Sequence, residues 1–174
     1  MSRQMPIETR NVAMAAIFMA LSVVLSPLTF TIGPVNPFPF QHLINSIAGV
    51  LLGPWYAITM ATIVAAIRFS LGIGTLFAFP IGIPGGLVVG LFHRYLIKND
   101  YAALTEPIGT GLIGSLLSAF LVGPLAVQAR MVENFDSLDL YVLYFLASSV
   151  PGSILGFLVL KAIRRIRIIT PEER

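Results

Sequence analysis

Charged residues are so widely spaced along this chain that they leave four long uncharged stretches. These stretches cover residues 11–67, 69–93, 107–129 and 140–160. An α-helix needs about 20 apolar residues to cross the hydrocarbon core of a bilayer. Each of the last three stretches is therefore long enough for one membrane-spanning helix, and the first is long enough for more than two.

Proline and glycine divide the first stretch. Pro34, Pro37 and Pro39 lie close together, and because proline cannot continue a helix, residues 29–40 are predicted to form a loop. A second break is predicted at Gly53-Pro54, since glycine suits the end of one helix and proline the first turn of the next. The six helices predicted in this way cover residues 10–28, 41–53, 54–70, 77–97, 107–129 and 139–164.

The second of these helices, residues 41–53, is short for a membrane span. At 1.5 Å per residue it covers about 20 Å. Irregular backbone at membrane depth must be shielded by protein or by a water-filled cavity. We therefore expect the proline-rich loop before this helix to dip into the bundle.

The distribution of basic residues predicts the orientation in the membrane. With six spans, both termini lie on one side, and the other side holds only Arg68 and Arg130 of the eleven basic residues. The positive-inside rule then places both termini in the cytoplasm. The expected fold class is one all-α integral membrane domain over residues 1–174, a bundle of six transmembrane helices. The nine basic residues on the cytoplasmic side are Arg3, Arg10, Arg94, Lys98, Lys161, Arg164, Arg165, Arg167 and Arg174.

Composition excludes several classes of protein. Hydrophobic residues make up 56% of the chain and charged residues 11%, with a mean hydropathy of +0.88, whereas soluble domains contain about 25% charged residues. The net charge of +3, without a stripe of basic and aromatic side chains, argues against nucleic acid as a partner. The absence of cysteine excludes disulfides and thiolate chemistry. We found no clear signal-peptide cleavage site before Pro27, so the first helix is expected to stay in the mature protein.

Arg68 is the most informative single residue, because an ionisable side chain inside a membrane is costly and usually functional. It lies about 21 Å along its helix from Pro54, which puts it near the outer edge of the membrane. His42 is expected at a similar height, and Asn45 shares its short helix. These residues would form a polar pocket near the outer surface. The alternatives are an arginine that snorkels to the headgroups and a histidine that is satisfied within the structure.

Further polar residues gather at the predicted outer ends of the last two helices. Gln128, Arg130 and Glu133 end one helix and begin the following loop. Tyr144 and Ser148 share a face of the next helix with Tyr141, at steps of three and four. The alternative for the tyrosines is a belt of interfacial aromatic residues.

Small residues form a stripe on the first helix. Ala13, Ala16 and Ala20 lie on one helical face together with Thr9. Such a stripe lets another helix approach closely in lipid. That helix could belong to a partner or to the same bundle. The stripes of the later helices are expected to pack internally, and they comprise Gly82, Gly86 and Gly90, then Gly114 and Ser118, then Gly152 and Gly156.

Catalytic, metal-binding and ATPase motifs are missing. There is no H-E-x-x-H, G-x-S-x-G or Walker A sequence. We therefore expect no enzyme activity, no cofactor and no metal site, and no ATP hydrolysis by this chain alone. Apart from Asp139 at the first residue of the last helix, none of the six predicted spans contains a carboxylate, which argues against a transporter coupled to protons or sodium.

Several segments resemble one family of membrane proteins. They are residues 38–57 (FPFQHLINSIAGVLLGPWYA), 68–75 (RFSLGIGT) and 79–82 (FPIG). Together with six spans, cytoplasmic termini and the Ala16–Ala20 pair, they resemble the substrate-binding S components of energy-coupling factor (ECF) vitamin transporters, specifically the ThiW type. The resemblance implies uptake of a thiamine precursor such as hydroxyethylthiazole or its phosphate, across the cytoplasmic membrane of a prokaryotic cell.

The resemblance also implies partners and a site. A transmembrane T component would contact Ala13, Ala16 and Ala20, two ATPase subunits would drive transport, and the S component would topple in the membrane. Phe77, Phe79 and Tyr144 would stack on the heterocycle, and Arg68 would also suit a phosphorylated ligand. Alternatives are an S component for another small vitamin, and a membrane assembly protein or intramembrane enzyme that transports nothing. The residues in or near the implied pocket are His42, Asn45, Arg68, Gln128, Tyr144 and Ser148.

Overall fold

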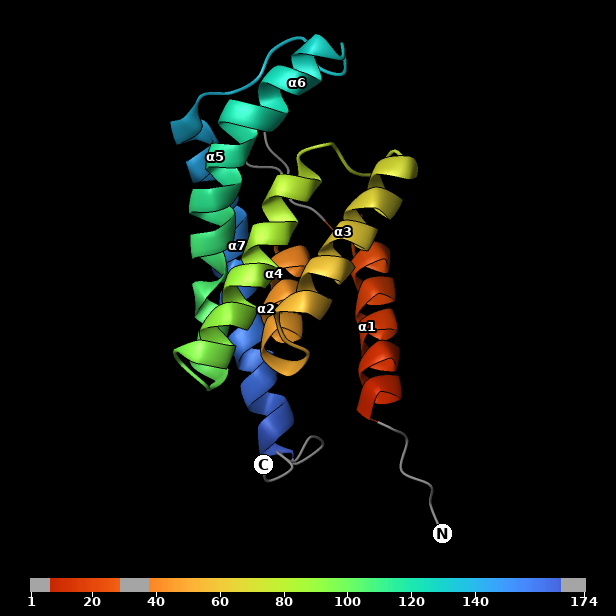
Figure 1. Ribbon diagram of the computed structural model, residues 1–174, viewed down its shortest axis with the longest axis vertical. Helices are drawn as coiled ribbons and strands as arrows, with labels where there is room; N and C mark the ends of the chain where they lie inside the picture. Colours follow the sequence, from red (N-terminus) through yellow and green to blue (C-terminus); the bar gives the residue numbers. More distant parts are fainter. Residues whose placement is uncertain (1–6, 29–37, 167–174) are drawn as a thin grey trace.

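Six helical segments run side by side in the computed structural model, which describes residues 7–28 and 38–166. No strand occurs among these residues, so the all-helical prediction is confirmed for them. The first helix begins and the last helix ends at the same end of the bundle (Figure 1). The segments are α1 Ile7–Val24, α2 Pro39–Leu51, α3 Pro54–Ser70, α4 Ala78–Tyr95, the stretch Asp100–Gln128, and α7 Leu138–Arg165.

The stretch Asp100–Gln128, here called the composite helix, begins well before the expected residue 107. It consists of a 3₁₀ turn (Asp100–Thr105), a π-helical stretch (Ile108–Gly114), α5 (Ser115–Leu117), a second π-helical stretch (Ser118–Val122) and α6 (Gly123–Gln128). Asn99 caps its start, because the side-chain oxygen accepts a hydrogen bond from the amide of Tyr101 at 2.9 Å. The prediction of carboxylate-free spans is therefore wrong, since this apolar helix includes Asp100 and Glu106.

The break between α2 and α3 lies where it was predicted. Gly53 adopts a left-handed φ of +86° and Pro54 opens the next helix. The Gly53 amide donates back to the Ala48 carbonyl at 3.2 Å, which closes the end of α2. A short helix followed at once by its neighbour places α2 inside the bundle, where it contacts α1, α3, α4, α7 and the start of the composite helix.

Glycine lets the helices approach one another closely. An added Cβ at Gly90 would lie 2.5 Å from the Pro54 backbone, and one at Gly86 would lie 3.1 Å from the Ala57 side chain. At Gly114 it would meet the Pro80 carbonyl at 2.6 Å, and at Gly156 the Ser46 side chain at 2.7 Å. The expectation that these later small-residue stripes pack internally is confirmed.

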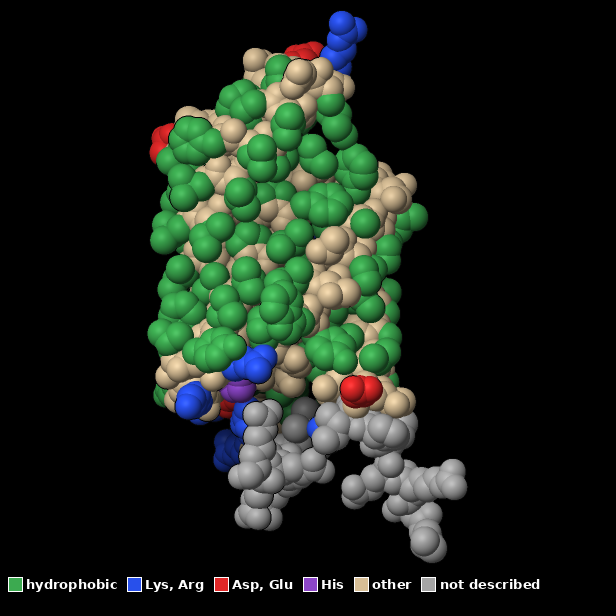
Figure 2. Space-filling view, in the orientation of Figure 1, with side chains coloured by type: hydrophobic (Ala, Val, Ile, Leu, Met, Phe, Trp, Pro, Cys, Tyr) green, Lys and Arg blue, Asp and Glu red, His purple; other side chains and the backbone are tan. Residues whose placement is uncertain are grey.

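The outer surface of the bundle is apolar, and the charges lie at its ends. Val24 and Trp55 are each 72% exposed, and Phe120 is 71% exposed. Figure 2 shows, on one face, a broad band of hydrophobic side chains between two ends that hold the charged ones. By length and composition, two described segments could cross a membrane, the composite helix and α7.

Candidate functional site

Arg68, near the end of α3, lies in a small buried cluster formed with the start of α2. It is 7% exposed, and one of its terminal nitrogens donates to the Gln41 side-chain oxygen at 2.6 Å. The guanidinium also lies over the Phe38 ring, 4.6 Å from its centroid, which is within range of a cation–π contact. The Nε atom of Arg68 has no hydrogen-bond partner among the described residues. Arg68 is thus buried within protein rather than extended toward headgroups.

The side chain of Gln41, which belongs to this cluster, has room in the structure because the facing residue of the neighbouring helix is a glycine. A Cβ at Gly82 of α4 would lie 2.7 Å from the Gln41 side-chain nitrogen. Beneath the amide, a cavity of about 10 Å³ separates α1, α2 and α3, with room for about one water molecule. This cavity is too small for a vitamin precursor. It is lined by Ser22, Gln41, Ile44, Asn45, Met60, Ala61 and Val64.

His42 bonds to a carboxylate that sequence reasoning missed, rather than to any group of the Arg68 cluster. Its Nδ1 lies 2.8 Å from Oε1 of Glu106, and the two side chains are 2% and 0% exposed. Thr110 donates to the same oxygen at 2.7 Å, whereas Oε2 of Glu106 has no partner in the described residues. The structure therefore satisfies His42 internally, which was the alternative left open. A lone carboxylate directly before an uncharged stretch of 23 residues was the available signal for Glu106.

Two other predicted pocket residues hold backbone groups in place. Asn45 donates from its side-chain nitrogen to the Gly82 carbonyl at 3.0 Å, and it is 5% exposed. Ser148 of α7 accepts a hydrogen bond from the Phe38 amide at 2.9 Å. Ser148 therefore fixes the residue whose ring covers Arg68, so the structure links two of the six predicted residues, Arg68 and Ser148, through Phe38.

An aromatic cluster lies near the start of α7. Tyr141 packs between Phe77 and Phe145, with ring centroids 5.5 Å and 5.6 Å away. Tyr144 packs on the edge of this cluster and is partly buried. The structure brings Phe77 to Tyr141 rather than to Tyr144, so the most buried tyrosine is not the predicted one.

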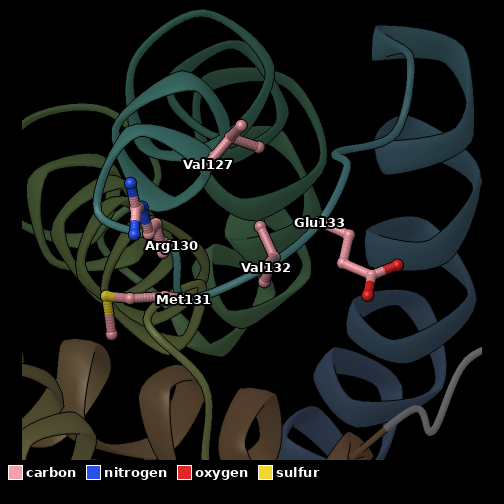
Figure 3. Close-up of a pocket in the computed structure, with 5 residues that line it drawn as sticks. All are labelled: Val127, Arg130, Met131, Val132 and Glu133. Carbon is pink, nitrogen blue, oxygen red and sulfur yellow. The ribbon is translucent and has the colours of Figure 1, made fainter.

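A groove opens on the loop that follows α6. Its volume is about 470 Å³, and its lining includes Arg130 and Glu133, whose side chains point away from each other (Figure 3). Arg130 adopts a left-handed φ of +56° at this point. Gln128, at the end of α6, is exposed beside it. Sequence reasoning placed these three residues at one end of the molecule, and the structure agrees.

The alanine stripe of α1 faces outward. Ala13, Ala16 and Ala20 are all exposed, whereas Ala15 and Ser22 form the buried face of the same helix. Internal packing of the stripe is therefore excluded within the described residues. The predicted loop before α2 lies mostly at residues 29–37, outside the described residues.

A comparison with protein families matches residues 12–166 to the model described as thiamine-precursor transporter protein, ThiW. The comparison with curated proteins found no match. The family match includes every helix described above, apart from the first residues of α1, and the entire polar cluster around Arg68. Because the match covers most of the chain, this protein belongs to the ThiW family of thiamine-precursor transporters, and it is a membrane protein.

Proposed function

We propose that the protein is the substrate-binding S component of an ECF-type transporter. It would bind a thiamine precursor, such as hydroxyethylthiazole or its phosphate, while separate subunits hydrolyse ATP. The observation that supports this most is the ThiW family match over residues 12–166. The lack of a Walker A sequence in the chain agrees with an external source of energy.

The proposed topology has six spans with both termini in the cytoplasm of a prokaryotic cell. The apolar band between charged ends supports it, as does the shared end at which α1 begins and α7 ends. Arg94, Lys98, Lys161 and Arg164 would then lie at the cytoplasmic surface, and Arg130 at the outer one. This arrangement follows the positive-inside rule.

The proposed partner surface is the exposed alanine stripe of α1. Its small side chains would let a helix of the T component approach closely in the bilayer. Two ATPase subunits would bind that T component rather than this chain. The outward direction of Ala13, Ala16 and Ala20 supports this assignment over internal packing.

The proposed ligand-binding residues differ in their roles. Arg68 would contact the ligand directly, and Tyr144 would pack on the heterocycle. Ser148, His42 and Asn45 would hold α2 in place. Ser148 bonds to Phe38 at its start, and His42 and Asn45 bond from α2 to Glu106 and to the Gly82 carbonyl. Gln128 would lie at the mouth of the pocket, next to the groove behind α6.

Uptake into proteoliposomes tests this function. The full-length protein, reconstituted with a T component and both ATPase subunits, should accumulate radiolabelled hydroxyethylthiazole or its phosphate only when ATP is enclosed on the ATPase side. The same vesicles with an ATPase subunit inactivated should accumulate none. Equal uptake by this chain alone would contradict the S-component assignment while leaving transport of the precursor intact.

A second candidate is a transporter that works alone and is driven by protons. The pairing of His42 with the fully buried Glu106 favours it, because buried carboxylate–histidine chains occur in proton relays. This candidate predicts uptake by the chain alone under a pH gradient. Glu106→Gln, which keeps the size of the side chain but cannot ionise, should abolish that uptake. No response to a pH gradient would remove this candidate.

A further inference from the structure

Arg68 is a buried cation without an anionic partner in the parts of the chain that the structure describes. The two ion pairs found there join His42 to Glu106 and Arg164 to Asp100. Among the described residues, the one side chain that accepts a hydrogen bond from Arg68 is the neutral amide of Gln41. Burying an arginine costs free energy that is normally offset by a paired anion.

The sequence extends this observation to residues that the structure does not describe. There is no Asp or Glu between residues 9 and 99, so residues 29–37 cannot supply a carboxylate. Glu106 already bonds to His42 and Thr110. Glu133, Asp136 and Asp139 are all exposed on the loop after α6 or at the start of α7. The protein thus offers Arg68 no buried counter-charge of its own within the described residues.

The surroundings of Arg68 hold its guanidinium in place. Phe38 covers it on one side, and the backbone of Phe38 is itself fixed by Ser148. At its stem, Gly74 packs so closely that a Cβ there would lie 2.9 Å from the Arg68 Cβ. One terminal nitrogen donates to Gln41, and Nε has no partner within residues 7–28 and 38–166. A guanidinium fixed in this way can donate from its free edge to an anionic oxygen group.

We propose that Arg68 binds the anionic group of the transported substrate, which is therefore a phosphate monoester rather than a neutral alcohol. This inference rests on the proposed function, because hydroxyethylthiazole is a neutral alcohol that acquires an anionic group when its hydroxyethyl arm is phosphorylated. The phosphate supplies the counter-charge that the described protein lacks at Arg68. Gln41 then positions Arg68 from the side opposite the ligand.

Binding to the purified full-length protein tests this proposal. Wild-type protein should bind hydroxyethylthiazole phosphate at least about tenfold more tightly than hydroxyethylthiazole, as expected for a hydrogen bond between charged groups. Arg68→Met should remove this preference, so that the phosphate binds no more tightly than the neutral alcohol. Arg68→Lys, which retains the charge without the planar fork, should keep part of it. Equal affinities in the wild type, or a preference that survives in R68M, would overturn the proposal.

Two matched variants locate the effect. Arg94→Met makes the same change at an exposed position of α4 and should leave both affinities unaltered. Arg130→Met makes the same change in the groove on the loop that follows α6. If R130M rather than R68M abolished the preference, the anion site would lie in that groove and the proposal would be wrong. If R68M failed to fold, the proposal would still be tested by whether the wild type prefers the phosphate and whether R68K keeps part of that preference.

A fragment without the thiazole separates failure of this inference from failure of the proposed function. Ethyl phosphate should raise the melting temperature of the wild type but not of R68M. If it does so while neither thiazole compound binds, the anion site stands and the thiazole substrate is wrong. If the neutral alcohol binds and phosphate adds nothing, the substrate class of the proposed function stands and the inference is overturned. If nothing binds, both fail.

Discussion

At the scale of single residues, the buried polar groups of this protein have two different fates. Glu106 is 0% exposed and bonds to both His42 and Thr110, so its carboxyl group is hydrogen-bonded inside the fold. Arg68 is 7% exposed, and its guanidinium contacts a neutral amide and an aromatic ring in the part of the chain that the structure describes. The bonds of Glu106 stabilise the packing of α2 on the composite helix. The surroundings of Arg68 leave N–H groups that can donate to a ligand.

Removal of the Glu106 carboxylate should destabilise the protein strongly. Glu106→Ala leaves His42 and Thr110 buried without their partner, a loss of about 3–5 kcal/mol for a broken buried pair. Glu106→Gln can still accept from Thr110 and should cost less. The midpoint of thermal unfolding in detergent measures both.

The control is Glu133→Ala, which removes an exposed carboxylate and should leave the melting temperature unchanged. A Glu106→Ala variant as stable as the wild type would show that the His42–Glu106 contact contributes nothing to the fold.

At the scale of helices, one face of α1 binds the bundle and the other is free. Ala15 packs with Ile44, Ala48 and Met60, whereas the Ala13, Ala16 and Ala20 stripe points outward. Residue type alone did not separate the two faces, because α1 is apolar all round and alanine occurs on both. Contact with α2 and α3 decides which face is buried.

Bulky residues on this stripe should block assembly with the T component. Ala16→Trp and Ala20→Trp would keep the partner helix from approaching, because small residues set the distance between helices in lipid. Co-purification with the T component should be lost, while binding of the thiazole ligand is retained. Both can be measured on the same detergent-solubilised preparation.

Leu21→Trp is the matched control, since Leu21 is 44% exposed on the same helix but lies to one side of the stripe. It should leave the complex intact. Loss of ligand binding in the alanine variants with the complex preserved would contradict the assignment of this face.

At the scale of the whole molecule, an apolar band separates two ends of different charge. Arg94, Lys98, Lys161 and Arg164 lie at or near the ends of α4 and α7, at the end of the bundle where α1 begins (Figure 1). Arg130 and Glu133 lie in the loop between α6 and α7. The Arg164–Asp100 ion pair, at 2.7 Å, ties α7 to the composite helix. The proposed topology places that pair near the cytoplasmic surface.

Single cysteines can test this topology directly, because the natural chain contains none. Glu133→Cys should react with a membrane-impermeant thiol reagent added to intact cells. Lys98→Cys should react only after the cells are permeabilised. Both residues are exposed, so the side of the membrane rather than burial governs the reaction. Labelling in the opposite order would invert the proposed orientation.

Sequence alone determined the helical class, the position of the Gly53–Pro54 break and the internal packing of the glycine stripes. These depend on local properties, namely charge spacing, proline geometry and the size of a side chain. It also singled out Arg68, because a lone arginine inside an apolar helix is conspicuous at any depth.

Only the tertiary structure decided how the polar residues pair. Counting along helices gives height, but not the direction in which a side chain points, so His42 was expected beside Arg68 and instead bonds to Glu106. The predicted helix began at residue 107, which left Glu106 in a loop. In the structure the composite helix starts earlier, with a 3₁₀ turn that packs against α2, α4 and α7, and such tertiary contacts cannot be seen in a local pattern. Buried hydrogen bonds join residues up to 110 positions apart, and no local pattern encodes that choice of partner.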